Sequence, residues 1–133
     1  MKRHEGAFFL LKGFTMKLLI TVLLILSSSA FADYFTPLDG PGVTIEKMHF
    51  HDQGGVTLNI SGSVQNLDNC AVTSRVHIPK DLPGFNNMLS ASLMAYTTGK
   101  KIGIHLSGCE SIPFWGAGGG LTPIVKNLWV FND

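Results

Sequence analysis

The chain has 133 residues, of which 45% are hydrophobic and only 14% are charged, and its formal net charge is +1. Soluble domains usually carry roughly 25% charged residues, so this composition is apolar, and it excludes a disordered tail and a collagen-like repeat. The small net charge excludes a strongly basic nucleic-acid-binding protein.

The apolar excess is concentrated at the N-terminus. A stretch of nine residues, 18–26, is apolar except for one threonine, and it lies between a charged segment that includes Met16 and the A-x-A sequence at 30–32. This order is typical of a secretory signal peptide, and the apolar stretch is too short for a transmembrane helix, which needs about 20 residues. We therefore predict a signal peptide over residues 1–32, with 1–15 as a candidate upstream mis-start, and no membrane span in the mature chain.

Cleavage of this leader predicts a mature domain at residues 33–133, located outside the cell or in a periplasm. The domain carries six basic and eight acidic residues, a formal charge of −2, so binding to a phosphate backbone loses its main driving force. About 100 residues are enough for one domain. Cys70 and Cys109 are the only cysteines, and in an oxidising compartment such a pair usually forms a disulfide.

The mature sequence predicts five strands and one helix. Residues 56–61 alternate between apolar and polar side chains, which is typical of a half-buried strand, and Gly99 follows a helical pattern as a natural stop. The predicted elements are strands at 43–50, 56–61 and 72–78, a helix that Asn86 or Asn87 caps and that runs to about Thr98, and strands at 102–106 and 124–131. This is the element order of an OB-fold, so we predict a mainly β (α+β) fold: a five-stranded, OB-fold-like barrel with one helix between strands three and four.

The last predicted strand is apolar on both faces. A barrel strand needs only an apolar inner face, so its outer face must be covered by the N-terminal arm, by the helix or by a second subunit. Strict alternation places three residues on that outer face: Val125, Trp129 and Phe131. We predict these residues as a candidate interface of a homo-oligomer.

Phe114 and Trp115 are the candidate ligand-binding residues. They lie on a predicted Gly-rich loop, 107–122, between the last two strands. An aromatic pair on a loop can stack on a sugar or a base. The alternative is that both rings cover the open end of the barrel.

Four histidines are the candidates for a metal site. His49 and His51 are two residues apart and would share one face of an extended strand, with His77 or His105 as a third ligand, although both are predicted to point outward. Solvated surface histidines are the more common explanation, so we predict no metal and no cofactor. The sequence has no G-x-S-x-G motif, and a disulfide leaves no free cysteine, so we also predict no enzymatic activity.

The segment from the predicted helix end carries a resemblance. Thr98-Gly99-Lys100 leads into the alternating strand at 102–106, and Cys109 and a strand beginning at Pro123 follow. This segment resembles the binding subunits of subtilase-cytotoxin and typhoid-toxin-type AB toxins, over roughly residues 68–130 with gaps. The resemblance implies an OB-fold, binding of cell-surface glycans and a ring of five subunits. The sugar-contacting segments of those subunits do not align with residues 33–50, so it assigns no glycan-site residue.

Together these observations favour a secreted or periplasmic, non-catalytic binding module, similar to a toxin B subunit, that binds a cell-surface glycan and no nucleic acid. Two alternatives remain open. One is an exported structural or protein-interaction domain without a small ligand. The other is a small metal-binding protein that uses its surface histidines.

Overall fold

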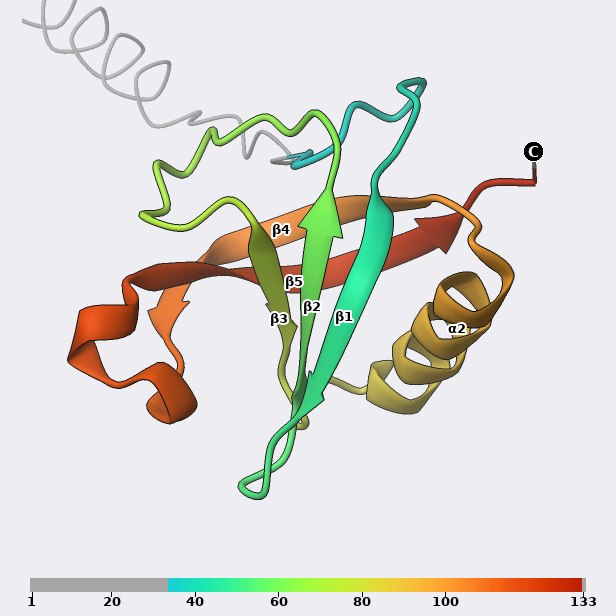
Figure 1. Cartoon of the computed structure of the whole chain (residues 1–133). Helices are drawn as coiled ribbons and strands as arrows, with labels where there is room; N and C mark the ends of the chain where they lie inside the picture. Colours follow the sequence, from blue (N-terminus) through green and yellow to red (C-terminus); the bar gives the residue numbers. More distant parts are fainter. Residues whose placement is uncertain (1–33, 133) are drawn as a thin grey trace, which may run out of the picture. The chain divides into compact units, whose positions relative to one another are not determined.

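The computed structural model describes residues 34–132, so the predicted signal peptide lies outside the described residues (Figure 1). The described residues form a mainly β fold with one helix between the third and fourth strands, as the sequence predicted. In chain order the elements are β1 (Thr44–Phe50), β2 (Val56–Ser61), β3 (Arg75–Ile78), α2 (Phe85–Thr98), β4 (Ile102–Ser111), the 3-10 turns η1 (Pro113–Trp115) and η2 (Ala117–Gly119), and β5 (Leu121–Val130).

The strands form one five-stranded sheet in the order β1-β2-β3-β5-β4. Neighbouring strands are antiparallel except β3 and β5, which run parallel and meet at His77 and Ile124. An isolated bridge joins Val43, just before β1, to Ile102 at the start of β4, through backbone hydrogen bonds of 2.9 and 2.8 Å. The remaining residues of β1 and β4 do not pair with each other, so the sheet is not closed into a complete barrel.

Helix α2 ends where the sequence predicted and begins slightly earlier. Gly99 takes the left-handed conformation, with φ of 70°, and caps the C-terminus. At the N-terminus the cap is Gly84 and no side chain bonds to the first turn, so the prediction that Asn86 or Asn87 caps the helix was wrong. The helix packs against β1, β3 and β5. No helix among residues 34–132 is long and apolar enough to cross a membrane.

A β-bulge in β1 explains why its sequence alternates imperfectly. Ile45 pairs with Ile60, but Lys47 pairs with Asn59, so Glu46 is an extra residue. Beyond the bulge the alternation resumes with the opposite phase. As a result Met48 packs against the core, whereas His49 lies on the other face of the sheet.

A second bulge, in β5, corrects one prediction. His105 pairs with Asn127 and Leu106 pairs with Val125, which leaves Lys126 as the extra residue. Val125 is therefore turned inward and is fully buried in the core. The prediction that Val125 shares the outer face with Trp129 was wrong, because it assumed unbroken alternation.

The last two strands are longer than predicted. β4 extends to Ser111 and β5 begins at Leu121, which shortens the connecting loop to residues 112–120. The register of β4 shifts between Leu106 and Cys109, where Gly108 has a φ of 75°. This irregularity removes the alternating pattern that would have indicated the strand.

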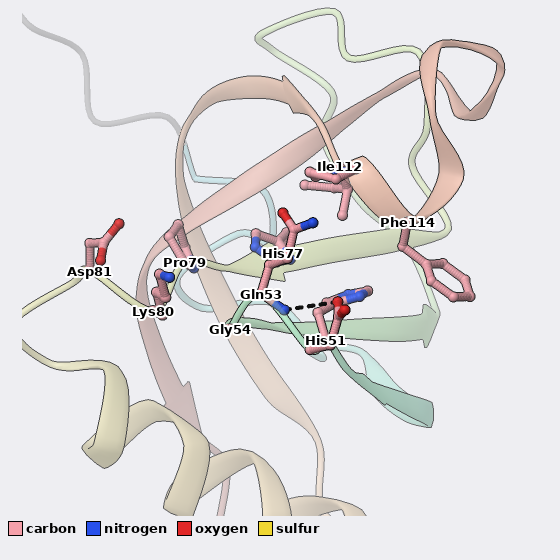
Figure 2. Close-up of a pocket in the computed structure, with 11 residues that line it drawn as sticks. His51, Gln53, Gly54, His77, Pro79, Lys80, Asp81, Ile112 and Phe114 are labelled. Atoms are coloured by element: carbon pink, nitrogen blue, oxygen red, sulfur yellow. Dashed lines mark hydrogen bonds between the residues drawn. The ribbon is translucent and has the colours of Figure 1, made fainter.

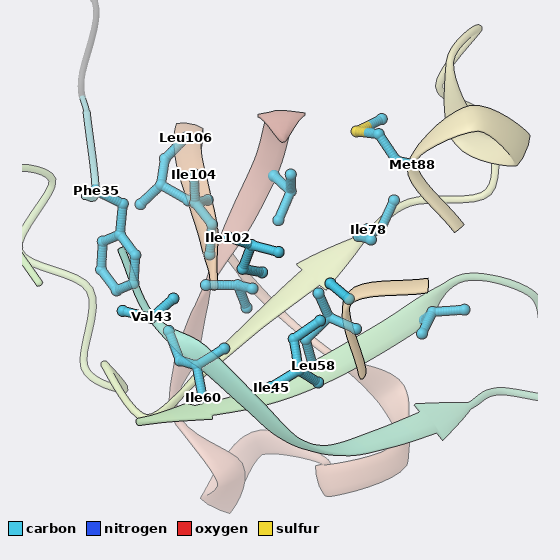
Figure 3. Close-up of a cluster of buried hydrophobic side chains, with 14 residues drawn as sticks. Phe35, Val43, Ile45, Leu58, Ile60, Ile78, Met88, Ile102, Ile104 and Leu106 are labelled. Carbon is cyan, nitrogen blue, oxygen red and sulfur yellow. The ribbon is translucent and has the colours of Figure 1, made fainter. Parts of the chain in front are cut away.

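The core is built from both halves of the sheet and from the segment before β1 (Figure 3). Phe35 is fully buried, and the backbone N–H groups of Phe35 and Thr36 donate to the carbonyl of Ile104 over 3.0 and 3.2 Å. In return, the Ile104 N–H donates to the Thr36 hydroxyl over 2.8 Å. The N-terminal arm is therefore attached to β4 along the core.

The predicted disulfide between Cys70 and Cys109 is present, and it joins the loop after β2 to β4 with a Cα–Cα distance of 5.6 Å. Next to it, the Asp68 carboxylate accepts a hydrogen bond from the Gly108 N–H over 3.0 Å. The two contacts fix the irregular part of β4 to the loop that precedes β3.

Candidate functional site

A row of polar side chains crosses the face of β1, β2 and β3 that is opposite the core. His49 lies directly across from Thr57, and Thr57 lies directly across from His77. Residues paired in this way share one face of a sheet. The turn after β1 adds His51 to the same region, where its ring centre is 5.5 Å from that of His77.

Thr57 joins two of these imidazoles by hydrogen bonds. Its hydroxyl oxygen lies 2.8 Å from Nε2 of His51 and 2.9 Å from Nδ1 of His77. Thr57 is completely buried and His77 is only 9% exposed, so the bond between them is shielded from water, whereas the bond to His51 is partly buried. His77 faces away from the core, as predicted, but it is not a solvated surface histidine, since other segments cover this face.

Burial keeps these imidazoles uncharged. Desolvation, together with a smaller effect of the neighbouring His51, lowers the pKa of His77 to about 4. The pKa of His51 is also lowered, first by burial and then by His49, while Asp52 opposes the shift. Both side chains are therefore neutral at pH 7.

Trp115 covers this polar row and is held there by Arg75. The guanidinium carbon of Arg75 lies 4.1 Å from the centre of the indole, a cation–π contact. The Arg75 Nε also donates to the Thr122 hydroxyl over 3.2 Å, and its Nη2 donates to the Gly119 carbonyl. Across the sheet, His49 meets the indole at a steep angle, with ring centres 5.3 Å apart.

Phe114 differs from its neighbour because the residue is 67% exposed. It lies edge-on to Trp115, with ring centres 4.9 Å apart, and 5.6 Å from the ring of His51. The two aromatic residues predicted as ligand-binding are thus in contact but have different environments. Trp115 packs over the sheet, whereas Phe114 leaves much of its surface available.

A pocket of about 380 Å³ opens beside Phe114 (Figure 2). This volume lies at the small end of the range typical of small-molecule sites, roughly 300–1,000 Å³. Three chain segments contribute to its walls: the β1–β2 turn, the end of β3 with the residues after it, and the start of the β4–β5 loop. Its lining residues are His51, Asp52, Gln53, Gly54, His77, Pro79, Lys80, Asp81, Ile112, Pro113 and Phe114.

The histidines considered for a metal site fall into two groups. His49, His51 and His77 lie together, but His105 is on β4, where it contacts Tyr34 and bonds to Asn127 over 2.8 Å. Within residues 34–132, no group of three or more His, Cys, Asp or Glu side chains is arranged to hold a metal ion.

The two remaining residues of the predicted oligomer interface are half-buried by the chain itself. Trp129 lies against Gly103 and near Tyr34, and the ring of Phe131 lies against Gly42. Self-association through these residues stays a prediction. Light scattering at high protein concentration tests it.

Sequence reasoning did not single out Thr57 or Arg75. Thr57 is found only from the strand register, which places it between His49 and His77. Thr57 is the second residue of β2, and no local pattern marks it. Arg75 has no local signal either, because its hydrogen-bond partners follow it by more than 40 residues in the sequence.

No protein-family model, curated protein or solved structure gives a significant match to this chain. The functional argument therefore depends on the geometry of the described residues.

Proposed function

We propose that this chain is a non-catalytic binding domain that takes the ring of a neutral sugar in the pocket beside Phe114. The observation that carries the proposal is an exposed aromatic ring next to a small pocket with hydrogen-bonding walls. A sugar ring has C–H groups on its faces and hydroxyls around its edge. The former pack on an aromatic ring, and the latter bond to amide, carboxylate and imidazole groups.

The charges around the pocket favour an uncharged ligand. Lys80 is accompanied by Asp52 and Asp81, so the lining carries both signs, and its two imidazoles are neutral at pH 7. Gln53 contributes both a donor and an acceptor. A strongly anionic or cationic ligand would therefore find no matching excess of charge.

The fold supports this location for the site. We propose an OB-fold for this open sheet, and three features support it: the strand order, the parallel β3–β5 pair and the bridge between Val43 and Ile102. In OB-folds, oligosaccharides and oligonucleotides bind over strands two and three, between the β1–β2 and β4–β5 loops. The pocket lies between those two loops, and the formal charge of −2 on residues 33–133 disfavours an oligonucleotide.

The proposed setting is outside the cytoplasm. The Cys70–Cys109 disulfide and the leader-like sequence at residues 1–32 both support export. An exported sugar-binding domain meets glycans on cell surfaces, which makes these its proposed partner.

A glycan array tests the proposal. The full chain, exported by its expression host with the disulfide intact, should bind at least one class of neutral glycan. Phe114→Ala should weaken that binding about tenfold or more, while Tyr96→Ala should not change it, because Tyr96 is an exposed aromatic residue on α2 outside the pocket. A folded protein that binds no glycan, or equal binding by the Phe114→Ala variant, would overturn the proposal.

A further inference from the structure

We propose that His51 and His77, coupled through Thr57, recognise the hydroxyl-bearing edge of the ligand with one hydrogen-bond donor and one acceptor. This inference rests on the proposed sugar-binding function and specifies the chemistry of recognition. Both histidines line the pocket, and each uses one ring nitrogen for the shared Thr57 hydroxyl. The other two nitrogens, Nδ1 of His51 and Nε2 of His77, make no hydrogen bond within the described residues and are the groups left for a ligand.

The single proton of the Thr57 hydroxyl determines which of these free nitrogens is a hydrogen-bond donor and which is an acceptor. The Thr57 hydroxyl has a single proton, so it donates to one imidazole and accepts from the other. If Thr57 donates to His77, the free Nε2 of His77 carries a proton and the free Nδ1 of His51 does not. If Thr57 donates to His51, the free Nδ1 of His51 carries a proton and the free Nε2 of His77 does not. In both arrangements the two histidines together offer one donor and one acceptor.

The same count predicts the tautomers. When Thr57 donates to His77, both histidines carry their proton on Nε2; when it donates to His51, both carry it on Nδ1. The two side chains must therefore always be in the same tautomer. The combination of one free donor and one free acceptor holds only while both rings are neutral, since protonation of either ring puts a proton on both free nitrogens and leaves no acceptor.

A hydroxyl group matches such a pair, because it donates one hydrogen bond and accepts others. The ring centres are 5.5 Å apart, so the hydroxyls of one sugar ring can reach both nitrogens. A carboxylate only accepts and an ammonium group only donates, so either would leave one of the two nitrogens without a partner. The predicted ligand class is thus a neutral sugar with a free hydroxyl edge.

Nuclear magnetic resonance of the imidazole nitrogens tests the coupling in the full chain without any ligand. At pH 7, long-range ¹H–¹⁵N spectra should show His51 and His77 neutral and in one common tautomer. Thr57→Ser should preserve this state, and Thr57→Val should allow the two tautomers to differ. His105, which bonds to Asn127 instead, is the internal control and should not respond. Different tautomers in the unmodified protein, or a protonated ring at pH 7, would overturn the proposal.

Titration with methyl glycosides of glucose, galactose and mannose tests the recognition step. A glycoside that binds should shift the nitrogens of both His51 and His77, and removal of the recognised hydroxyl should weaken binding about tenfold or more. Thr57→Val should weaken binding similarly, whereas Thr57→Ser should retain it. Binding that shifts Phe114 but neither imidazole would overturn this inference and leave the proposed function intact. If the array finds no glycan and no glycoside shifts any pocket resonance, the proposed function itself fails.

Discussion

The indole of Trp129 lies directly on the backbone of Gly103, its partner across β4 and β5. A Cβ atom at residue 103 would come within 1.9 Å of the indole Cε2. Glycine is required here by this close approach, because only a residue without a side chain lets a broad ring lie flat on the sheet. Tyr34 meets the indole edge-on, with ring centres 6.3 Å apart. The N-terminal arm and Trp129 thus cover part of the outer face.

Gly103→Ala should destabilise the fold, because the added methyl group must displace the indole. We expect a loss of about 1–3 kcal/mol in the free energy of unfolding, measured by urea denaturation, together with a red shift of tryptophan fluorescence. Gly118→Ala is the matched control, since no heavy atom lies within 4 Å of the position its Cβ would occupy. Equal stability of the two variants would contradict the packing described for Trp129.

Removal of the disulfide should lower stability by a larger amount. Cys70 and Cys109 are separated by 39 residues, and closing a loop of this length stabilises by up to about 4 kcal/mol in the chain-entropy model. The double variant Cys70→Ala/Cys109→Ala should show this loss in urea denaturation, and reduction of the unmodified protein should give a similar one. Two free thiols in the mass spectrum of the non-reduced, exported chain would show that the bridge does not form.

Stability should fall as the pH falls below about 6.5, because of His77. Its pKa is lowered from 6.5 to about 4 by burial, so between these values the unfolded chain binds a proton that the folded chain does not. The stabilisation is complete above the unfolded pKa and is lost as the pH drops through the folded pKa, up to roughly 3 kcal/mol for the full shift. His77→Gln should show a weaker pH dependence in this range, and an unchanged dependence would contradict the burial effect.

The sequence predicted the elements whose patterns are local. Gly99 marks the end of α2, and the two cysteines pair as expected. The error in β5 arose at a bulge: an extra residue, such as Lys126 there or Glu46 in β1, reverses which side chains face the core, and a single sequence has no marker for that reversal. In β5 this made Val125 look exposed although it is buried.

The site was predictable only where one segment carried it. Phe114 and Trp115 stood out as an aromatic pair on a Gly-rich loop, because aromatic residues in such loops are uncommon. Their different environments could not be foreseen, since these depend on how residues 112–120 fold back over the sheet. The contact between Thr57 and His77 required the pairing register of β2 and β3, and Arg75 required its distant partner, Thr122.

Arg75→Lys should loosen the loop of residues 112–120 without removing a positive charge. Lysine lacks the planar guanidinium that stacks on Trp115 and bonds at the same time to Thr122 and Gly119. We expect a loss of about 1–2 kcal/mol in the free energy of unfolding and faster amide hydrogen exchange in this loop.

Lys47→Gln is the matched control for Arg75→Lys, because Lys47 is an exposed cation on β1, paired with Asn59, and it should leave both measurements unchanged. Slow exchange in the Arg75→Lys loop would show that the segment is held by other contacts.

Since Phe114 directly precedes Trp115, a loosened loop should also weaken sugar binding, and it should do so without any change to a group that lines the pocket. Such a loss would separate two roles of Phe114. Phe114→Ala removes the ring that contacts the ligand, whereas Arg75→Lys keeps the ring but no longer fixes its position.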